Sequence, residues 1–202
     1  GMLAVCDALA HDMAALGLPR EKITIHYTGL DRDRFRPLQH TLLRRRLSRE
    51  LGIEIPDRAP VLATVGALIP RKGQALVIDA LADLPSDTVL VLVGRGDEEN
   101  TLRKRTADIG AAGRVHFLGS LDHDMLPLVL SAADAMVLPS ASEGLANAWI
   151  EALACSKSCM TAVSVISKLM RSGSKPLFNT IETIFSVFSG ELRSCGERLK
   201  ER

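Results

Sequence analysis

Short apolar runs alternate along the chain with longer stretches in which apolar residues recur every three or four positions. The short runs are rich in Val, Leu and Ile, which is typical of buried strands, and the longer periodicity is typical of amphipathic helices. This alternation predicts a doubly wound, Rossmann-like α/β fold in which helices cover a parallel sheet. The expected strands are residues 22–27, 61–66, 88–94, 114–118 and 135–139.

Two of these runs have the pattern of central strands. Residues 61–65 and 89–93 carry apolar side chains on both faces, as strands with a helical layer on each side do. Each run is followed by a glycine, Gly66 or Gly94, at the carboxyl edge where sheets of this kind bind ligands. We therefore expect a ligand site at these strand ends.

Helical periodicity marks residues 43–51, 73–84 and 102–109, and a further helix is expected from about residue 145. The first of these helices carries an arginine cluster on its outer face. A polar face of this kind usually lies in solvent, so we interpret the cluster as solvated rather than functional. Its members are Arg44, Arg45, Arg46 and Arg49.

Composition narrows the classes of function. The chain has 202 residues, 47% of them hydrophobic, and a formal net charge of +1, which suits a single α/β domain with a core and gives no basic surface for nucleic acid. A small-molecule ligand is therefore expected. The four cysteines form no CxxC pair and no His lies at metal-ligand spacing, so we predict no metal site and interpret the cysteines as reduced thiols of a cytoplasmic protein.

The first candidate site is the turn that follows residues 61–65. Gly66 lets a ligand approach the backbone, while Arg71 and Lys72 place two cations at the start of the next helix, where a diphosphate would bind. The alternative is a basic pair that merely begins an exposed helix, and the preceding strand favours the diphosphate site. The spacing matches neither of the two common glycine-rich nucleotide-binding motifs.

The second candidate site covers residues 139–155. A glycine-containing loop follows the last strand and leads into a helix, whose free N–H groups and positive dipole end face the same sheet edge and suit a phosphate. Glu143 precedes the helix and Glu151 lies about two turns inside it, so one carboxylate can meet a sugar and the other a ribose. A glutamate buried in so apolar a helix needs a partner.

Together these motifs resemble the retaining, nucleotide-sugar-dependent glycosyltransferases of group 1, family 4, which have the GT-B fold. The most specific feature is the Glu-x7-Glu spacing of Glu143 and Glu151. The resemblance implies that the chain holds the C-terminal, donor-binding half of a GT-B enzyme. The other matching motifs, in family order, are Gly29-Leu30-Asp31 with Phe35 and Pro37, Lys72-Gly73, Val93-Gly94-Arg95-Gly96, Phe117-Leu118-Gly119, Pro139-Ser140 and Glu151-Ala152-Leu153-Ala154-Cys155.

The resemblance also implies a role for each site residue. Catalysis would depend on Arg71 and Lys72, which would stabilise the leaving diphosphate, and on Glu143, which would contact the donor sugar. Glu151 would hold the ribose hydroxyls, Leu121 would touch the base through its backbone, and amides beside Glu143 would cradle phosphate. Protein cations and helix dipoles meet the diphosphate charge in this fold, so no metal or other cofactor is expected. The expected donor-binding residues are Gly66, Arg71, Lys72, Leu121, Gly144, Leu145, Ala146 and Glu151.

The chain departs from the family pattern in three places. Ala67 stands where many members carry arginine, so one phosphate contact is absent or is made by Arg71. Residues 1–37 resemble only an inter-domain remnant, so we expect the acceptor-binding domain to be missing and the isolated chain to be inactive as a transferase. After Cys155 the family continues with Gly-Thr-Pro-Val-Val, which this chain lacks.

Composition changes at the same point. All 13 aspartates precede residue 156, whereas 9 of the 15 serines follow Cys155. We interpret residues 156–202 as an atypical tail from a reading-frame change or a fusion, with a sixth strand at 161–167 and a helix at 177–192. The expected division is a remnant at 1–37, a donor-binding domain at 38–155 and the tail at 156–202.

The favoured function is transfer of a sugar, with retention of configuration, from a UDP- or GDP-sugar to a glycan or lipid-linked acceptor in polysaccharide biosynthesis. The full-length parent is expected to associate peripherally with a membrane. One alternative is a truncated, catalytically inactive nucleotide-binding or interaction domain. Another is a different enzyme of doubly wound fold, such as an epimerase, over which the pair of Glu143 and Glu151 favours the transferase. The sugar, the nucleobase and the acceptor stay open.

Overall fold

The computed structural model describes residues 1–38, 42–140 and 146–155. Its main body is a four-stranded sheet with the strand order β5-β4-β3-β6. All neighbouring strands in this sheet are parallel, which confirms the predicted α/β class. The strands are β3 (Val61–Val65), β4 (Val89–Val93), β5 (Val115–Gly119) and β6 (Ala135–Met136).

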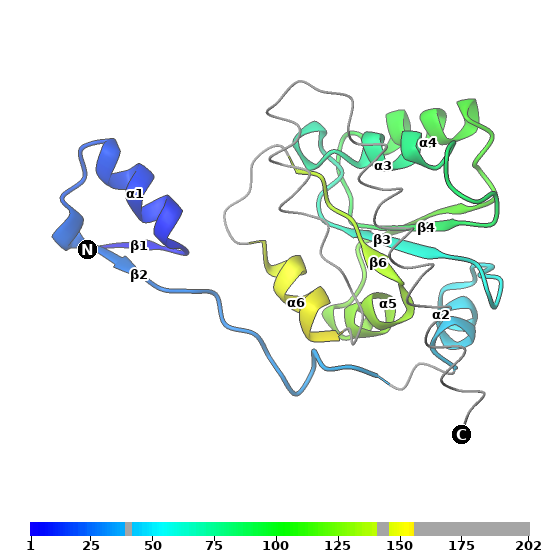
Figure 1. Cartoon of the computed structure of the whole chain (residues 1–202), viewed down its shortest axis with the longest axis horizontal. Helices are drawn as coiled ribbons and strands as arrows, with labels where there is room; N and C mark the ends of the chain where they lie inside the picture. The colour runs from blue at the N-terminus through cyan, green and yellow to red at the C-terminus, as the bar shows by residue number, and fades with distance from the viewer. Residues whose placement is uncertain (39–41, 141–145, 156–202) are drawn as a thin grey trace.

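Helices cover both faces of this sheet (Figure 1). One face packs against α3 (Gln74–Ala80) and α4 (Glu99–Asp108), and the other against α2 (Leu43–Leu51), α5 (Leu126–Ala132) and α6 (Asn147–Cys155). The chain winds from β3 to β4 and β5 on the first face, then returns through α5 to β6 on the far side of β3. The winding therefore reverses between β3 and β6, and such a switch point is where open α/β sheets bind ligands.

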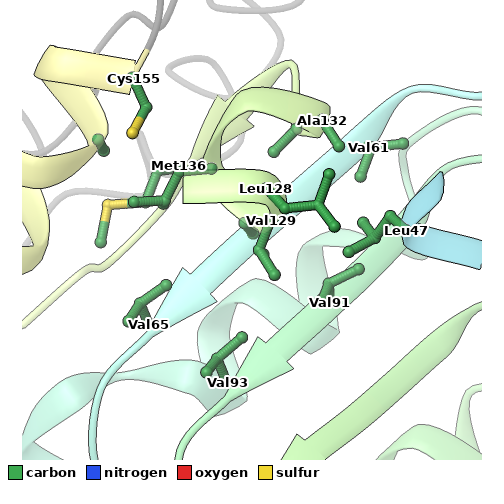
Figure 2. Packing of buried hydrophobic residues seen from close by; sticks show 14 of the residues in the cluster. Leu47, Val61, Val65, Val91, Val93, Leu128, Val129, Ala132, Met136 and Cys155 are labelled. Atoms are coloured by element: carbon green, nitrogen blue, oxygen red, sulfur yellow. The ribbon is translucent and has the colours of Figure 1, made fainter. Parts of the chain in front are cut away.

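The core has two parts because successive side chains of the central strands point to opposite faces of the sheet. In β4, Val91 and Val93 belong to the cluster under α2, α5 and α6, whereas Leu90 and Leu92 belong to the cluster under α3 and α4. Figure 2 shows the first of these clusters, in which Leu128 of α5 packs over the valines of the two central strands. Burial on both faces explains why the strands read as almost continuous apolar runs in the sequence.

The N-terminal residues form a small unit that stands apart from this sheet in Figure 1. Two parallel strands, β1 (Met2–Ala4) and β2 (Ile23–Ile25), pack with α1 (Asp7–Ala15), and the short η1 (Arg20–Lys22) precedes β2. The sequence predicted a strand at β2 but not at β1. The segment after β2 contains a turn at residues 32–34.

The last strand is shorter than the predicted 135–139. The Val137 N–H still donates to the Ala63 carbonyl at 2.8 Å, but the Thr64 hydroxyl donates to the Val137 carbonyl at 2.9 Å. Pro139 has no N–H to continue the ladder, so pairing ends there. Within the described ranges, no helix has both the length and the apolar character needed to cross a membrane. The predicted elements at 161–167 and 177–192 lie outside those ranges.

One arginine of α2 is not solvated, which corrects our interpretation of the arginine cluster. Arg44 Nη2 donates to both carboxylate oxygens of Asp134 at 2.6 Å, and Arg44 Nη1 donates to the Ala59 carbonyl at 2.8 Å. These two side chains are only 15% and 19% exposed. Asp134 also accepts the Val61 N–H at 2.7 Å, so the pair fastens α2 to the starts of β3 and β6. Helical periodicity predicts which face of a helix is polar. It does not predict which residues of other segments contact the side chains on that face.

Replacing Arg44 with alanine is expected to lower the free energy of unfolding by about 2–4 kcal/mol, because the Asp134 carboxylate keeps its partly buried position and loses its charged partner. The matched control is Arg45→Ala in the same helix turn. Arg45 pairs with Asp57 in solvent, its side chain is 70% exposed, and its loss should leave stability almost unchanged. Urea unfolding followed by circular dichroism measures both variants, and equal losses would contradict the structural role of Arg44.

Candidate functional site

The two segments that the sequence singled out lie against each other at the carboxyl edge of the sheet. After β3 the chain forms η3 (Pro70–Lys72) and then Gly73, whose φ of +72° lies in the left-handed region. A Cβ on Gly73 would lie 2.5 Å from the Pro139 carbonyl oxygen. The turn after β3 therefore touches the point where the chain leaves β6 for α6. The described parts of the two candidate sites therefore lie together at the switch point between β3 and β6.

Lys72 lies across the end of β3. A Cβ on Gly66 would lie 3.8 Å from Lys72 Cε and 3.8 Å from Leu138 Cδ1, so the lysine stem passes over the strand-end glycine. The backbone beneath it is held by buried Gln74, whose Nε2 donates to the Ala67 carbonyl at 2.8 Å. The structure thus brings the predicted residues Gly66 and Lys72 together. Arg71, beside Lys72, is exposed at the same edge.

The loops after β3 and β4 are in direct backbone contact. A Cβ on Gly94 would lie 2.0 Å from the Gly66 carbonyl oxygen, and one on Gly96 would lie 2.2 Å from the Leu68 carbonyl oxygen, so only glycine fits at either position. Between them, exposed Arg95 extends over the end of β5, where its Nε lies 3.3 Å from the place of a Cβ on Gly119. Arg95 is therefore a third cation of this edge. The motif Val93-Gly94-Arg95-Gly96 did not by itself predict a role for this arginine, and the flanking glycines were the signal for it.

Glu151 has the partner that its burial requires. Its side chain is 12% exposed, and His123 Nε2 lies 3.1 Å from Glu151 Oε1. His123 begins the short η4 (His123–Met125) after β5, so this contact joins the loop after β5 to α6. The sequence pattern did not predict this pair, because 28 positions separate the residues and no periodicity links them.

The remaining predicted residues are placed in part. Ala146 is half-buried directly before α6, which begins at Asn147, two positions later than expected. Leu121 is half-buried and packs against the core beyond β5. Residues Glu143, Gly144 and Leu145 lie outside the described residues, so their roles stay predictions.

The chemistry of this edge suits an anion that also carries hydroxyl groups. Arg71, Lys72 and Arg95 supply positive charge, and the N-terminal end of α6 adds backbone N–H donors. Glu151, in the adjoining helix α6, supplies an acceptor for hydroxyls. Among the described residues, no group of three or more His, Cys, Asp and Glu side chains is arranged to hold a metal ion.

Comparison with known proteins identifies relatives of this chain. The family model described as "Glycosyl transferases group 1" matches residues 51–170. The GDP-mannose-dependent alpha-(1-6)-phosphatidylinositol monomannoside mannosyltransferase of Mycolicibacterium smegmatis is 36% identical over 137 residues, which cover 63% of this chain and 35% of the relative. A lipopolysaccharide core biosynthesis glycosyltransferase of Rhizobium meliloti is 39% identical over 102 residues, which cover 50% of this chain and 29% of the relative. The chain thus spans about a third of the length of these relatives.

Solved structures show the same fold. The Anabaena protein HepE, solved in complex with UDP and glucose, superposes with a TM-score of 0.67 at 26% identity, over 76% of this chain and 41% of HepE. The C-terminal domain of a group 1 glycosyl transferase from Francisella tularensis superposes with a TM-score of 0.54 at 22% identity, over 63% of this chain and 67% of that domain. These likenesses confirm the predicted C-terminal GT-B fold.

Replacing Gly73 with alanine tests the contact that unites the two segments. The added Cβ meets the Pro139 carbonyl in addition to the strain of a positive φ, so we expect a loss of stability about 1–3 kcal/mol larger than for the control. The control is Gly52→Ala, where φ is +64° and nothing lies within 4 Å of the new Cβ, so that only the backbone strain of about 1 kcal/mol applies. Thermal unfolding compares the two, and equal losses would show that the turn does not depend on Pro139.

Proposed function

The chain belongs to the group 1 glycosyl transferases, and we propose that its site binds the nucleoside diphosphate of a nucleotide-sugar donor. The observation that carries the proposal is the position of Lys72 over Gly66, at the switch point and against the segment that leads into α6. A strand-end glycine, a lysine and a helix N-terminus at one place provide close approach, charge and N–H donors. A diphosphate uses all three.

The parent activity that we propose is transfer of the donor sugar, with retention of configuration, to a glycan or lipid acceptor. Lys72 and Arg71 would stabilise the charge that develops on the leaving diphosphate, and such fixed charge acts most strongly in the transition state. Glu143 would contact the sugar and Glu151 the ribose. Leu121 would lie against the base, and the amides of Gly144, Leu145 and Ala146 would cradle the phosphate.

The names of the relatives suggest which ligands to test first. The Mycolicibacterium relative uses GDP-mannose and acts on a phosphatidylinositol monomannoside, and HepE was solved with UDP and glucose. The Rhizobium relative acts in lipopolysaccharide core biosynthesis. UDP and GDP are therefore the two probes for the donor site, and lipid-linked glycans are the acceptors to test.

Nucleoside diphosphates are expected to bind at least tenfold more tightly than the corresponding nucleosides, because charge-assisted hydrogen bonds to phosphate contribute about 1.5–3 kcal/mol each. Lys72→Ala should remove most of this preference. The matched control is Lys104→Ala, an exposed lysine on the outer side of α4. Calorimetric titration with UDP, GDP, uridine and guanosine measures the effect. An unchanged dissociation constant for Lys72→Ala would show that the lysine is only a surface charge.

Chelation should leave nucleotide binding unchanged, because we assign the diphosphate charge to protein cations and backbone donors rather than to a divalent ion. The measurement is a UDP or GDP titration in excess EDTA, compared with one in millimolar Mg²⁺ at the same ionic strength. Strict dependence on the divalent ion would overturn the metal-free assignment.

A further inference from the structure

We propose that His123 and Arg34 are positioning residues that hold the Glu151 carboxylate in the orientation in which it accepts the ribose hydroxyls. The proposal rests on the proposed function, since it assigns Glu151 to the ribose of a bound nucleotide. What is new is a series of hydrogen bonds that begins at Arg34, in the segment before α2, and ends at Glu151 in the site.

The chain of contacts starts at a compact turn around Asp31. Asp31 Oδ1 accepts the backbone N–H groups of Asp33 and Arg34 at 3.1 Å, and the Asp31 carbonyl accepts the Phe35 N–H at 2.8 Å. An aspartate that binds the N–H groups two and three positions ahead forces the backbone to turn. The turn sends Phe35 into the core, where it is 2% exposed, and leaves Arg34 facing η4.

Arg34 and Phe35 together hold the imidazole of His123. Arg34 Nη1 lies 3.0 Å from His123 Nδ1, and Arg34 Nε forms a salt bridge with Asp124 Oδ1 at 2.9 Å, which helps to hold the guanidinium. The Phe35 ring lies 4.9 Å from the imidazole centroid at an interplanar angle of 60°. A tilted aromatic contact at this distance is favourable. The imidazole is therefore oriented by two consecutive residues of the segment before α2, although its side chain is half exposed.

The contact with Arg34 determines which nitrogen of His123 carries the proton. A guanidinium can only donate hydrogen bonds, so Nδ1 must present its lone pair to Arg34. The proton of the neutral ring then lies on Nε2, which is the nitrogen 3.1 Å from Glu151 Oε1. Every hydrogen bond points the same way, from Arg34 to His123 and from His123 to Glu151. His123 is thus a donor to the carboxylate without carrying a charge itself.

The hydrogen bond from His123 to Oε1 orients the Glu151 carboxylate for binding the two hydroxyls of a ribose. A carboxylate has about four acceptor positions, so one bond from His123 leaves room for two ribose hydroxyls. Because the side chain is already fixed and only 12% exposed, little rotational freedom remains to be lost when a ribose binds. Without His123 the carboxylate would lose the only partner that the described residues give it. It would then have to be ordered by the ligand.

The test compares the binding of a nucleoside diphosphate that contains ribose with that of an analogue whose sugar lacks the 2′ and 3′ hydroxyls. We expect His123→Ala to weaken binding of UDP or GDP about tenfold and to change binding of the 2′,3′-dideoxy analogue less than twofold. His123→Gln should restore most of the affinity, because its amide N–H can occupy the place of Nε2–H. Arg34→Ala should give a smaller loss, also confined to the ribose ligand.

The matched control is His116→Ala. His116 lies in β5 and its Nε2 lies 3.2 Å from the Glu54 carbonyl oxygen, so its removal should affect neither ligand. Equal weakening of both ligands by His123→Ala would mean that His123 only supports the fold, and no weakening of either would also overturn the proposal. If the unaltered protein binds neither UDP nor GDP, the proposed function itself fails.

Nitrogen-15 spectra of the histidine side chains provide a test that needs no nucleotide. We expect His123 to be the Nε2–H tautomer in the unaltered protein, and Arg34→Ala should allow the Nδ1–H tautomer to appear. A dominant Nδ1–H tautomer in the unaltered protein would overturn the hydrogen-bonded chain even if the nucleotide binds.

Discussion

Burial of β3 and β4 on both faces is the constraint on which the rest of the structure depends. Helices α2, α5 and α6 cover one face and α3 and α4 the other, so no ligand can reach the middle of either strand. Only the carboxyl ends, where strands turn into loops, present backbone and side chains to a ligand. The reversal of winding between β3 and β6 then selects one place along that edge, and the candidate site lies there.

Close backbone packing turns that edge into a defined surface. Gly94 and Gly96 let the loops after β3 and β4 approach to distances that no side chain would allow, and Gly73 does the same for the turn against Pro139. These contacts fix the backbone from which Lys72 and Arg95 extend. The uncharged glycines therefore determine where the charged side chains of the site lie, because they determine the course of the loop backbone.

The structural effect of a polar side chain in this protein depends on how far it is shielded from solvent. Arg44 and Asp134 are shielded and connect a helix to two strands, whereas Arg45 and Asp57 form an exposed pair on the same helix. The Arg45 guanidinium lowers the pKa of the Asp57 carboxyl through a hydrogen bond and through its charge, yet solvent leaves that pair little structural effect. His123 and Glu151 lie between these extremes, with one partner half exposed and the other shielded, which is the setting in which a side chain can be held firmly and still meet a ligand.

The sequence alone determined the sheet, its helices and the members of the site that follow strand ends, because each of these leaves a local pattern. The central strands appear as short, almost continuous apolar runs, and apolar residues in helices recur every three or four positions. Gly66 follows the end of β3 directly, and Lys72 lies in the turn after it. The end of β6 depended instead on a side-chain bond from Thr64 of the neighbouring strand. The structural role of Arg44, whose partner lies 90 positions away, and the pairing of His123 with Glu151 and Arg34, 28 and 89 positions away, were decided only by the tertiary structure. Contacts between segments so distant in the chain exist only after the sheet has brought its loops to one edge, and no local periodicity records them.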